Sequence, residues 1–203
     1  MIDPRIYLAS RSPRRRELLG QIGVRFDLLL FRAGPREDAE VNEAWLPGET
    51  PEAYVQRVAR AKAAFAAGLL AHRRVLVRPV LAADTTLDLD GEVIGKPRDE
   101  ADAAAILARL SGRSHRVLTA IAMARDARVE HRLSISVVHF RELSTDEIRR
   151  YVNSGEPTDK AGAYGIQGRA AMFIEEIHGS HSGIVGLPLC ETALLLREFG
   201  YPL

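Results

Sequence analysis

The sequence predicts an α/β protein in which helices flank a mixed β-sheet. Two observations support this prediction. Short apolar runs of strand length alternate along the chain with segments whose apolar residues recur every three or four positions, as in helices. Asp90-Gly91 is also a hairpin signal between two alternating runs, so antiparallel pairs are expected. A chain that mixes hairpins with strand–helix units forms a sheet with both kinds of pairing.

The first half of the chain predicts two strands and two helices before the hairpin. A strand covers Arg5 to Ala9, and Ser12 and Pro13 then cap and start a helix that ends at about Ile22. A second strand covers Phe26 to Phe31, and a long polar loop follows it. Thr50 and Pro51 then cap and start a helix from Pro51 to about Ala71. Its apolar stripe consists of Val55, Val58, Ala59, Phe65, Ala66 and Leu69.

The second half predicts helices that frame another antiparallel pair. The segments expected are a helix at 99–110, strands at 117–125 and 133–140, a helix at 145–153, strands at 172–177 and 184–185, and a helix from 188 to 200. Ser144 and Glu147 form the capping box of the helix at 145–153. Between residues 155 and 171 the chain is a glycine-rich loop.

Composition narrows the functional class. The 203 residues suit one domain, or one domain with two lobes, spanning 1–203. Basic and acidic residues nearly cancel, 28 against 27, so we expect no nucleic-acid partner, because such binding needs a strongly basic face. No apolar run is long enough for a membrane span, so we expect no membrane partner. The single cysteine, Cys190, fits a reducing compartment, and we expect a cytoplasmic protein.

The strand-to-helix junction "YLASRSPRRREL" predicts a phosphate site. A helix N-terminus offers free N–H groups and partial positive charge. Ser10 and Ser12 add hydroxyl groups, and Arg14 and Arg15 add guanidinium groups that match phosphate oxygens. The alternative is that the arginines of this stretch are simply solvated. We accept that alternative for Arg11 and Arg16, and favour phosphate binding for the other two.

Lys62 is a cation on the apolar stripe of its helix. It lies four residues after Val58 and three before Phe65. An unpaired charge facing the core is costly, so a functional partner is one explanation. The other is that the stem packs and the ammonium reaches water. The sequence favours neither explanation.

Asp84 and Lys96 each follow a strand-like run. Asp84 ends "PVLAAD", and ligand sites in α/β sheets gather at the carboxyl ends of strands. Lys96, in "IGKP", reaches the same region. Their ordinary alternatives are a turn aspartate and a solvated lysine, and for Lys96 taken alone the second is the stronger.

The glycine-rich loop "TDKAGAYGIQG" offers Lys160, Tyr164 and Gln167 to a ligand. The amide of Gln167 suits a nucleobase edge. An ordinary surface loop is the alternative, and the mixture of amide, aromatic and charged groups favours binding modestly. His178 and His181 are too loosely spaced to indicate a metal site, and Cys190 is expected in the core. Neither nucleotide-binding glycine motif, G-x-x-x-x-G-K-[ST] or G-x-G-x-x-G after a strand, is present.

Taken together, these motifs resemble the Maf family of nucleoside triphosphate pyrophosphatases. The matching stretches are "LASRSPRRRELL", "ARAK", "AADTTLDLDGEVIGKP", "LSGRSHRVLTAIA", "DKAGAYGIQG" and "GLPLCET", in order over nearly the whole chain. The resemblance implies a two-lobed α/β fold around a central cleft, similar to the inosine triphosphate pyrophosphatases. It implies cleavage of a nucleoside triphosphate to the monophosphate and pyrophosphate with a divalent metal, Mg²⁺ or Mn²⁺. It also implies that a homodimer can form.

Within the family, "SPRR", "ADT" and "KAGAYGIQG" are similar to the branch that acts on dTTP and UTP, and modified pyrimidine triphosphates are further candidates. This likeness implies that Asp84 is the catalytic residue and that Arg14, Thr85 and Gln167 tune base specificity. It assigns phosphate binding to Ser10, Ser12, Arg15, Lys62, Lys96 and Lys160. The family also has an acidic residue after the second strand, in a D-x-D-E-like stretch. Glu37 or Asp38 could supply it, and Glu37 with Asp84 would then hold the metal.

A different class of function is a nucleotide-binding regulatory protein, linked to cell division, without significant turnover. The same phosphate-binding residues would serve it. Asp84 argues for the enzyme, because a pure binder of triphosphate has little need for a carboxylate beside the anion. A purine-specific enzyme of similar fold is disfavoured by "GAYGIQG".

Overall fold

The structure is a computed structural model that describes residues 4–31 and 41–203. In these ranges the chain forms a seven-stranded sheet in the order β2-β1-β3-β5-β6-β7, and β4 pairs with β3. The strands are β1 (Arg5–Leu8), β2 (Arg25–Leu28), β3 (Val80–Leu89), β4 (Glu92–Ile94), β5 (Ser114–Arg125), β6 (Arg128–Phe140) and β7 (Ile174–His178). Strand β1 is parallel to β2 and β3, and the other described pairs are antiparallel. The predicted mixed sheet is therefore confirmed.

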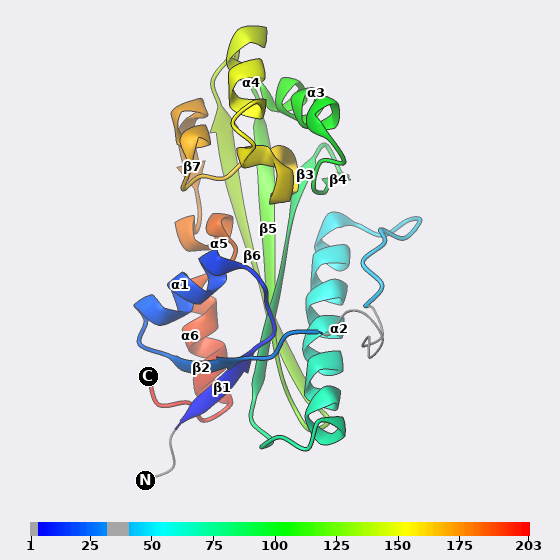
Figure 1. Cartoon of the computed structure of the whole chain (residues 1–203), viewed down its shortest axis with the longest axis vertical. Coiled ribbons are helices and arrows are strands. Elements are labelled where there is room, and N and C mark those ends of the chain that lie inside the picture. Colours follow the sequence, from blue (N-terminus) through cyan, green and yellow to red (C-terminus); the bar gives the residue numbers. More distant parts are fainter. Residues whose placement is uncertain (1–3, 32–40) are drawn as a thin grey trace.

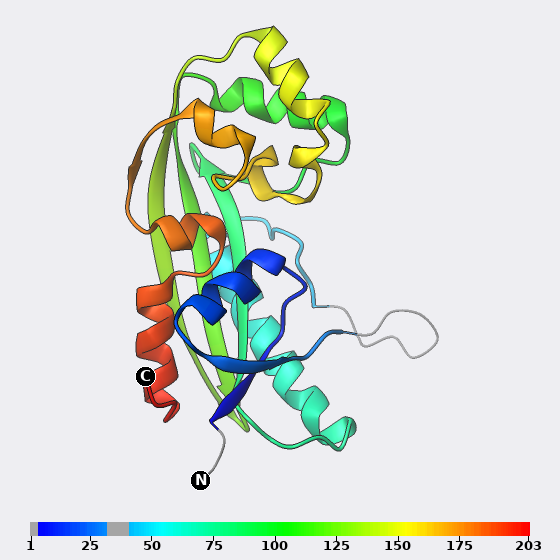
Figure 2. The same cartoon turned by 60° about the vertical axis from the view of Figure 1, so that its left-hand side comes forward.

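Helices cover the sheet in two lobes that share β3, β5 and β6 (Figures 1 and 2). The helices are α1 (Pro13–Gln21), α2 (Pro51–His72), α3 (Glu100–Leu110), α4 (Thr145–Val152), α5 (His181–Val185) and α6 (Leu189–Glu198). In the lower lobe α2 packs on one face of the sheet, whereas α1 and α6 pack on the other. In the upper lobe α3 and α4 pack on the far ends of the long strands.

Helix α2 lies against the sheet through small side chains. Its buried face includes Ala59, Ala63 and Ala66, and the strand residues beneath it include Ala82 and Ala120. The prediction of the stripe was wrong at Phe65 and Leu69, which are only partly buried, whereas Ala63 and Leu70 are buried. The reason is that the alanine-rich face fits the alanine-rich strands, so the bulkier residues lie at its margin.

The upper lobe has an aromatic core and a wall made of 3₁₀ turns. Phe140, Tyr151, Tyr164 and Phe173 meet in T-shaped, edge-to-face contacts in this core. The segment expected to be a structureless loop contains η1 (Glu156–Asp159), η2 (Ala161–Ala163) and η3 (Arg169–Phe173). Gly162 has φ 70°, and a Cβ there would lie 2.1 Å from a Leu87 methyl carbon, so glycine is required where this wall meets the core.

Two further predictions were wrong. Residues 184–185 are not a strand but lie in the helix α5. Ser180 caps that helix by accepting a hydrogen bond from the Gly183 N–H, and the helix buries Ile184 and Val185, so the two apolar residues mimic a buried strand in the sequence. Cys190 is exposed rather than in the core, because it falls on the solvent side of the first turn of α6.

Candidate active site

A deep cleft of about 1390 Å³ opens between the two lobes. It is lined by the junction of β1 and α1, by α2, by the middle of β3, by the end of β4 and by the 3₁₀ turns. The predicted site residues that line it are Ser10, Ser12, Arg14, Arg15, Lys62, Asp84, Thr85, Lys96, Lys160 and Gln167. The structure thus brings together every predicted site residue that it describes. Glu37 and Asp38 lie outside the described residues.

Basic side chains outnumber acidic ones among the described residues of the cleft. Six are lysine or arginine and four are aspartate or glutamate. The chain as a whole is close to neutral. The excess of positive charge is therefore local, and it favours an anionic ligand in the cleft.

At the base of the cleft, the Lys62 ammonium bridges two carboxylates. Its Nζ lies 2.9 Å from Asp84 Oδ1 and 2.9 Å from Glu43 Oε2. The side chains of Lys62 and Asp84 are only 15% and 12% exposed. Lys62 is therefore a paired cation on the inner face of α2, and the snorkelling explanation does not hold. The second oxygen of Asp84, Oδ2, accepts no hydrogen bond from the described residues.

Glu43 is held in place by a clamp at the start of α2. Arg57 donates to the carbonyls of Asn42 and Ala44 and to both oxygens of Glu49. Tyr54 donates its hydroxyl to the Glu43 carbonyl at 3.0 Å. Burial, together with the charges of Asp84 and Glu43, raises the pKa of Tyr54 to about 12, so this hydroxyl keeps its proton.

Thr85 lies next to Asp84 but faces the other side of β3, as strand alternation requires. There Arg15 donates from Nη2 to Thr85 Oγ1 at 3.1 Å and from Nε to the Gly186 carbonyl at 2.8 Å. Burial lowers the pKa of Arg15. No carboxylate of the described chain lies within ion-pair distance of Arg15, so its charge is held among neutral oxygens beside the cleft.

Ser10 and Ser12 organise the N-terminus of α1. Ser12 caps the helix by accepting from the Arg15 N–H, and Ser10 Oγ accepts from the Ser12 N–H at 3.2 Å. Arg15 Nη1 also donates to Ser10 Oγ, at 3.4 Å. Both serine oxygens act as acceptors here, which leaves their hydroxyl hydrogens able to point toward an anion in the cleft.

The upper wall of the cleft presents Lys160, Gln167 and Lys96. Lys160 Nζ donates to the Glu156 carbonyl at 2.6 Å and to Asp159 Oδ1 at 2.7 Å. Gln167 and Lys96 are exposed. Arg14, on the lower wall, reaches across to Asp159 Oδ2 at 3.8 Å. Asp159 therefore lies close to Arg14, a predicted specificity residue on the lower wall, and to Lys160, a predicted phosphate-binding residue on its own wall.

Glu156 holds the 3₁₀ turns of the upper wall together. Its carboxylate accepts from the Tyr151 hydroxyl at 3.0 Å and from the Arg169 N–H at 3.0 Å. A Cβ at Gly168 would lie 2.0 Å from Glu156 Oε1, so only glycine permits this approach. The wall also joins the β4 end through a bond from the Gly162 N–H to the Gly95 carbonyl.

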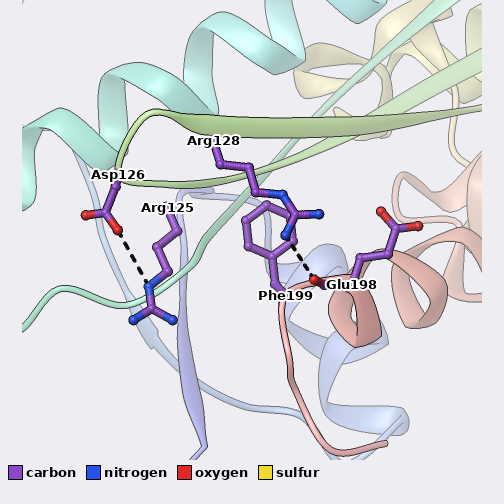
Figure 3. A pocket seen from close by; sticks show the side chains of 5 residues that line it. All are labelled: Arg125, Asp126, Arg128, Glu198 and Phe199. Atoms are coloured by element: carbon purple, nitrogen blue, oxygen red, sulfur yellow. Dashed lines mark hydrogen bonds and ion pairs between the residues drawn. The ribbon is translucent and has the colours of Figure 1, made fainter.

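A smaller hollow, away from this cleft, lies between the β5–β6 turn and the end of α6 (Figure 3). Its arginines already have partners: Arg128 donates to the Glu198 carbonyl and covers the Phe199 ring, and Arg125 lies 3.8 Å from Asp126. The chemistry gathers in the large cleft instead. His178 and His181 lie at the end of β7 and the start of α5, both exposed.

The fold and the cleft together define a class of protein. A two-lobed α/β protein with a basic cleft and two carboxylates at its base is suited to bind a polyphosphate and to activate water beside it. Across the described residues, no helix has both the length and the apolar character that a bilayer span requires.

Comparison with known proteins is consistent with this class. The Maf family, described as Maf-like protein, matches residues 5–199, so the chain belongs to the Maf family. The dTTP/UTP pyrophosphatase of Aromatoleum aromaticum is 63% identical over 203 residues, covering all of this chain and 98% of that protein. That of Dechloromonas aromatica is 59% identical over 97% of this chain and 98% of its own.

A solved structure of the Staphylococcus aureus Ham1 protein is also similar. It covers 67% of this chain and 71% of its own, with 18% identity and a TM-score of 0.44.

Glu43 is the cleft residue that sequence reasoning missed. The family spacing pointed to a D-x-D-E-like stretch, and residues 40–43 read E-V-N-E, which keeps acidic groups at both ends of that spacing. The signal for Glu43 is the spacing of these acidic residues and not the first acidic cluster after the strand.

Proposed function

We propose that this protein hydrolyses dTTP and UTP to the monophosphate and pyrophosphate. The observation that carries the proposal is the set of ten predicted residues on one basic cleft, with the Glu43–Lys62–Asp84 group at its base. The names of relatives with about 60% identity over nearly the whole chain support the same substrates. Modified pyrimidine triphosphates are further candidates for this cleft.

In the proposed reaction, water attacks the α-phosphorus of the substrate. The bond from that phosphorus to the bridging oxygen breaks, pyrophosphate leaves, and the water loses a proton. Asp84 is the proposed base, because it lines the cleft and Lys62 fixes its Oδ1, while its Oδ2 accepts no hydrogen bond from the described residues. Lys62, fixed by two carboxylates, contributes positive charge where phosphate charge develops.

The remaining cations hold the leaving group. Arg15 and the α1 N-terminus bind phosphate oxygens from the lower wall, and Lys96 and Lys160 bind them from the upper wall. Ser10 and Ser12 add hydroxyl donors. Arg14, Thr85 and Gln167, which line the same cleft, recognise the base.

The donor set also suits a divalent metal. Magnesium and manganese prefer oxygen ligands, and Mg²⁺ is commonly held by one or two carboxylates together with substrate phosphates. Asp84 and Glu43 supply such oxygens, and they share one ammonium, so they lie close together. Phosphate oxygens of the substrate would supply further ligands. When bound, the ion would stabilise the charge on the reacting phosphate.

The location and assembly of the protein stay predictions. The single cysteine still indicates a cytoplasmic protein. The homodimer rests on family resemblance alone.

The function is tested by pyrophosphate release from a panel of triphosphates with Mg²⁺ or Mn²⁺. The panel contains dTTP, UTP, CTP, purine triphosphates, 7-methyl-GTP and 5-methyl-UTP. We expect turnover of dTTP and UTP that Asp84→Asn reduces by about 10²- to 10⁴-fold while nucleotide still binds, because the base is lost and the phosphate-binding groups remain.

Asp126→Asn is the matched control. Asp126 is an exposed residue of the β5–β6 turn with φ 54°, a conformation that asparagine also tolerates. Activity of this variant should equal that of the native protein. Binding of dTTP without any turnover would instead support the regulatory alternative. Equal turnover in Asp84→Asn would exclude the proposed base.

A further inference from the structure

Thr119 is a buried polar residue that has no part in the proposed reaction. It lies on β5 directly opposite Thr85 on β3, and it is 1% exposed. Its hydroxyl does not line the cleft, but it touches a residue that does, because Thr85 Oγ1 and Thr119 Oγ1 are 3.0 Å apart. The direction of that hydrogen bond is fixed by the groups around it.

A hydroxyl has only one hydrogen to donate. Thr119 donates its hydrogen to the Gly183 carbonyl at 2.8 Å, since a carbonyl can only accept. The bond between the two threonines must therefore be donated by Thr85. Arg15 Nη2 donates to Thr85 Oγ1 from the other side. The relay thus runs from Arg15 to Thr85, then to Thr119, and ends at the Gly183 carbonyl.

Helix α5 closes this relay into a ring. The Gly186 N–H donates to the same Gly183 carbonyl at 3.0 Å, and the Gly186 carbonyl accepts from Arg15 Nε at 2.8 Å. Gly186 has φ 124°, and a Cβ there would lie 3.5 Å from Thr85 Oγ1 and 3.6 Å from Arg15 Nε. The ring joins α1, β3, β5 and the segment of α5, and rotation of the Thr85 hydroxyl would break the bond to Thr119 that closes it.

The ring leaves the Thr85 hydroxyl able to form only one kind of hydrogen bond with a ligand in the cleft. The hydroxyl hydrogen of Thr85 points toward Thr119, and one lone pair of its oxygen accepts from Arg15. One lone pair therefore remains for a ligand. Thr85 can accept a hydrogen bond from a ligand but cannot donate one.

We infer that Thr119 is a positioning residue for base selection, which it exerts by holding the Thr85 hydroxyl as an acceptor toward the N3–H group of thymine or uracil. This inference rests on the proposed function. Thymine and uracil carry a hydrogen on N3, whereas cytosine has a bare N3 acceptor. An acceptor that faces N3 therefore favours thymine and uracil. With cytosine, the Thr85 oxygen and the bare N3 would face each other as two acceptors without a hydrogen between them.

Removing the Thr119 hydroxyl tests the inference. In Thr119→Val the Thr85 hydrogen loses its acceptor and can turn toward the cleft, where it can donate to cytosine N3. We expect the preference for dTTP over dCTP to fall roughly tenfold, the size of one hydrogen bond. Thr119→Ser keeps the hydroxyl and should restore the native preference. The preference is measured both as a ratio of kcat/KM values and as a ratio of Kd values.

Thr192→Val is the matched control. Thr192 is also fully buried and donates its hydroxyl to a carbonyl, that of Pro188, but it lies on α6 away from the cleft. The Thr192→Val variant should prefer dTTP over dCTP to the same extent as the native protein. If Thr119→Val lowers activity on dTTP and dCTP equally, like any weakened core, the inference is overturned.

Two further measurements keep the test decisive. In a Thr85→Val background, Thr119→Val should not change the preference further, because it acts through Thr85. Should Thr119→Val fail to fold, native protein is compared on dTTP and its N3-methyl analogue. At least a tenfold loss with the analogue is expected, and equal handling of the two overturns the inference. Because Kd ratios report base preference without turnover, a protein that binds but does not hydrolyse would refute the proposed function and leave this test standing.

Discussion

Both walls of the cleft present charged side chains, but the two walls are built differently. On the lower wall, Lys62, Asp84 and Arg15 are carried by a long helix, a central strand and a capped helix start. On the upper wall, Lys160 is carried by short 3₁₀ turns that side chains hold together. The lower wall therefore fixes its groups through secondary structure, and the upper wall fixes them through a few individual contacts.

This difference suggests a division of labour. Catalytic groups need positions fixed to a fraction of an ångström, which regular elements provide. Groups that close over a substrate need a wall that can adjust, which turns provide. The lower wall accordingly has the proposed base and its paired lysine.

Among the substitutions that distinguish the two walls, Lys62→Met should reduce catalysis most. The substitution keeps the apolar stem but removes a cation that two carboxylates hold at 2.9 Å, and it leaves those carboxylates facing each other. We expect kcat/KM for dTTP to fall about 10²- to 10³-fold, the usual cost of losing a fixed charge-stabilising group. Steady-state kinetics with saturating metal measure it.

Arg60→Met is the control for Lys62→Met, since Arg60 is an exposed cation on the same helix. It should leave kcat/KM within about twofold, because exposed charges contribute little. Equal losses in both variants would mean that the general charge of α2 matters and that the fixed position of Lys62 does not.

The core behind the upper wall should make the protein sensitive to acid. His115 is buried, and its Nε2 lies 2.7 Å from the Tyr164 hydroxyl. Burial, with a smaller effect of nearby His139, lowers the pKa of His115 to about 4. The unfolded chain binds this proton at about pH 6.5. Stability from His115 is therefore complete above about pH 6.5 and is lost as the pH falls from there to about 4.

The expected loss is on the order of 3 kcal/mol in the free energy of unfolding between pH 7.5 and 4. Urea unfolding at several pH values measures it, and His115→Asn should flatten the profile. His178→Asn is the control, because His178 is exposed beside Glu176 and should leave the profile unchanged. A native profile that is already flat in this range would show that the core tolerates a charged His115.

The sequence predicted the lower wall well because local signals determine it. Ser12, Pro13, Thr50 and Pro51 mark where α1 and α2 begin, and both caps are present in the structure. The position of Lys62 on the stripe of α2 follows from helical periodicity. Its partners do not, because Asp84 comes from β3 and Glu43 depends on the Arg57 clamp.

The 3₁₀ turns of the upper wall could not be predicted from the sequence in the same way. Its turns depend on Glu156 reaching Tyr151 and Arg169, and on the bond between Gly162 and Gly95. These are contacts between distant residues, which leave no periodic pattern. The helix α5 was likewise hidden, because one helical turn with two apolar residues resembles a short strand.

Arg14→Met should have the smallest effect, because Arg14 bridges the two walls only loosely. Its Nη1 lies 3.8 Å from Asp159 Oδ2, and the two side chains are 29% and 66% exposed. Such a pair contributes at most about 0.5 kcal/mol to stability. We therefore expect the midpoint of urea unfolding to stay unchanged while KM for dTTP rises about fivefold, from the loss of one partly exposed contact to the substrate. Arg16→Met, an exposed arginine of α1 outside the cleft lining, should change neither quantity. A clear loss of stability in Arg14→Met would mean that the Arg14–Asp159 pair holds the walls together, and the two walls would then have to be treated as one unit.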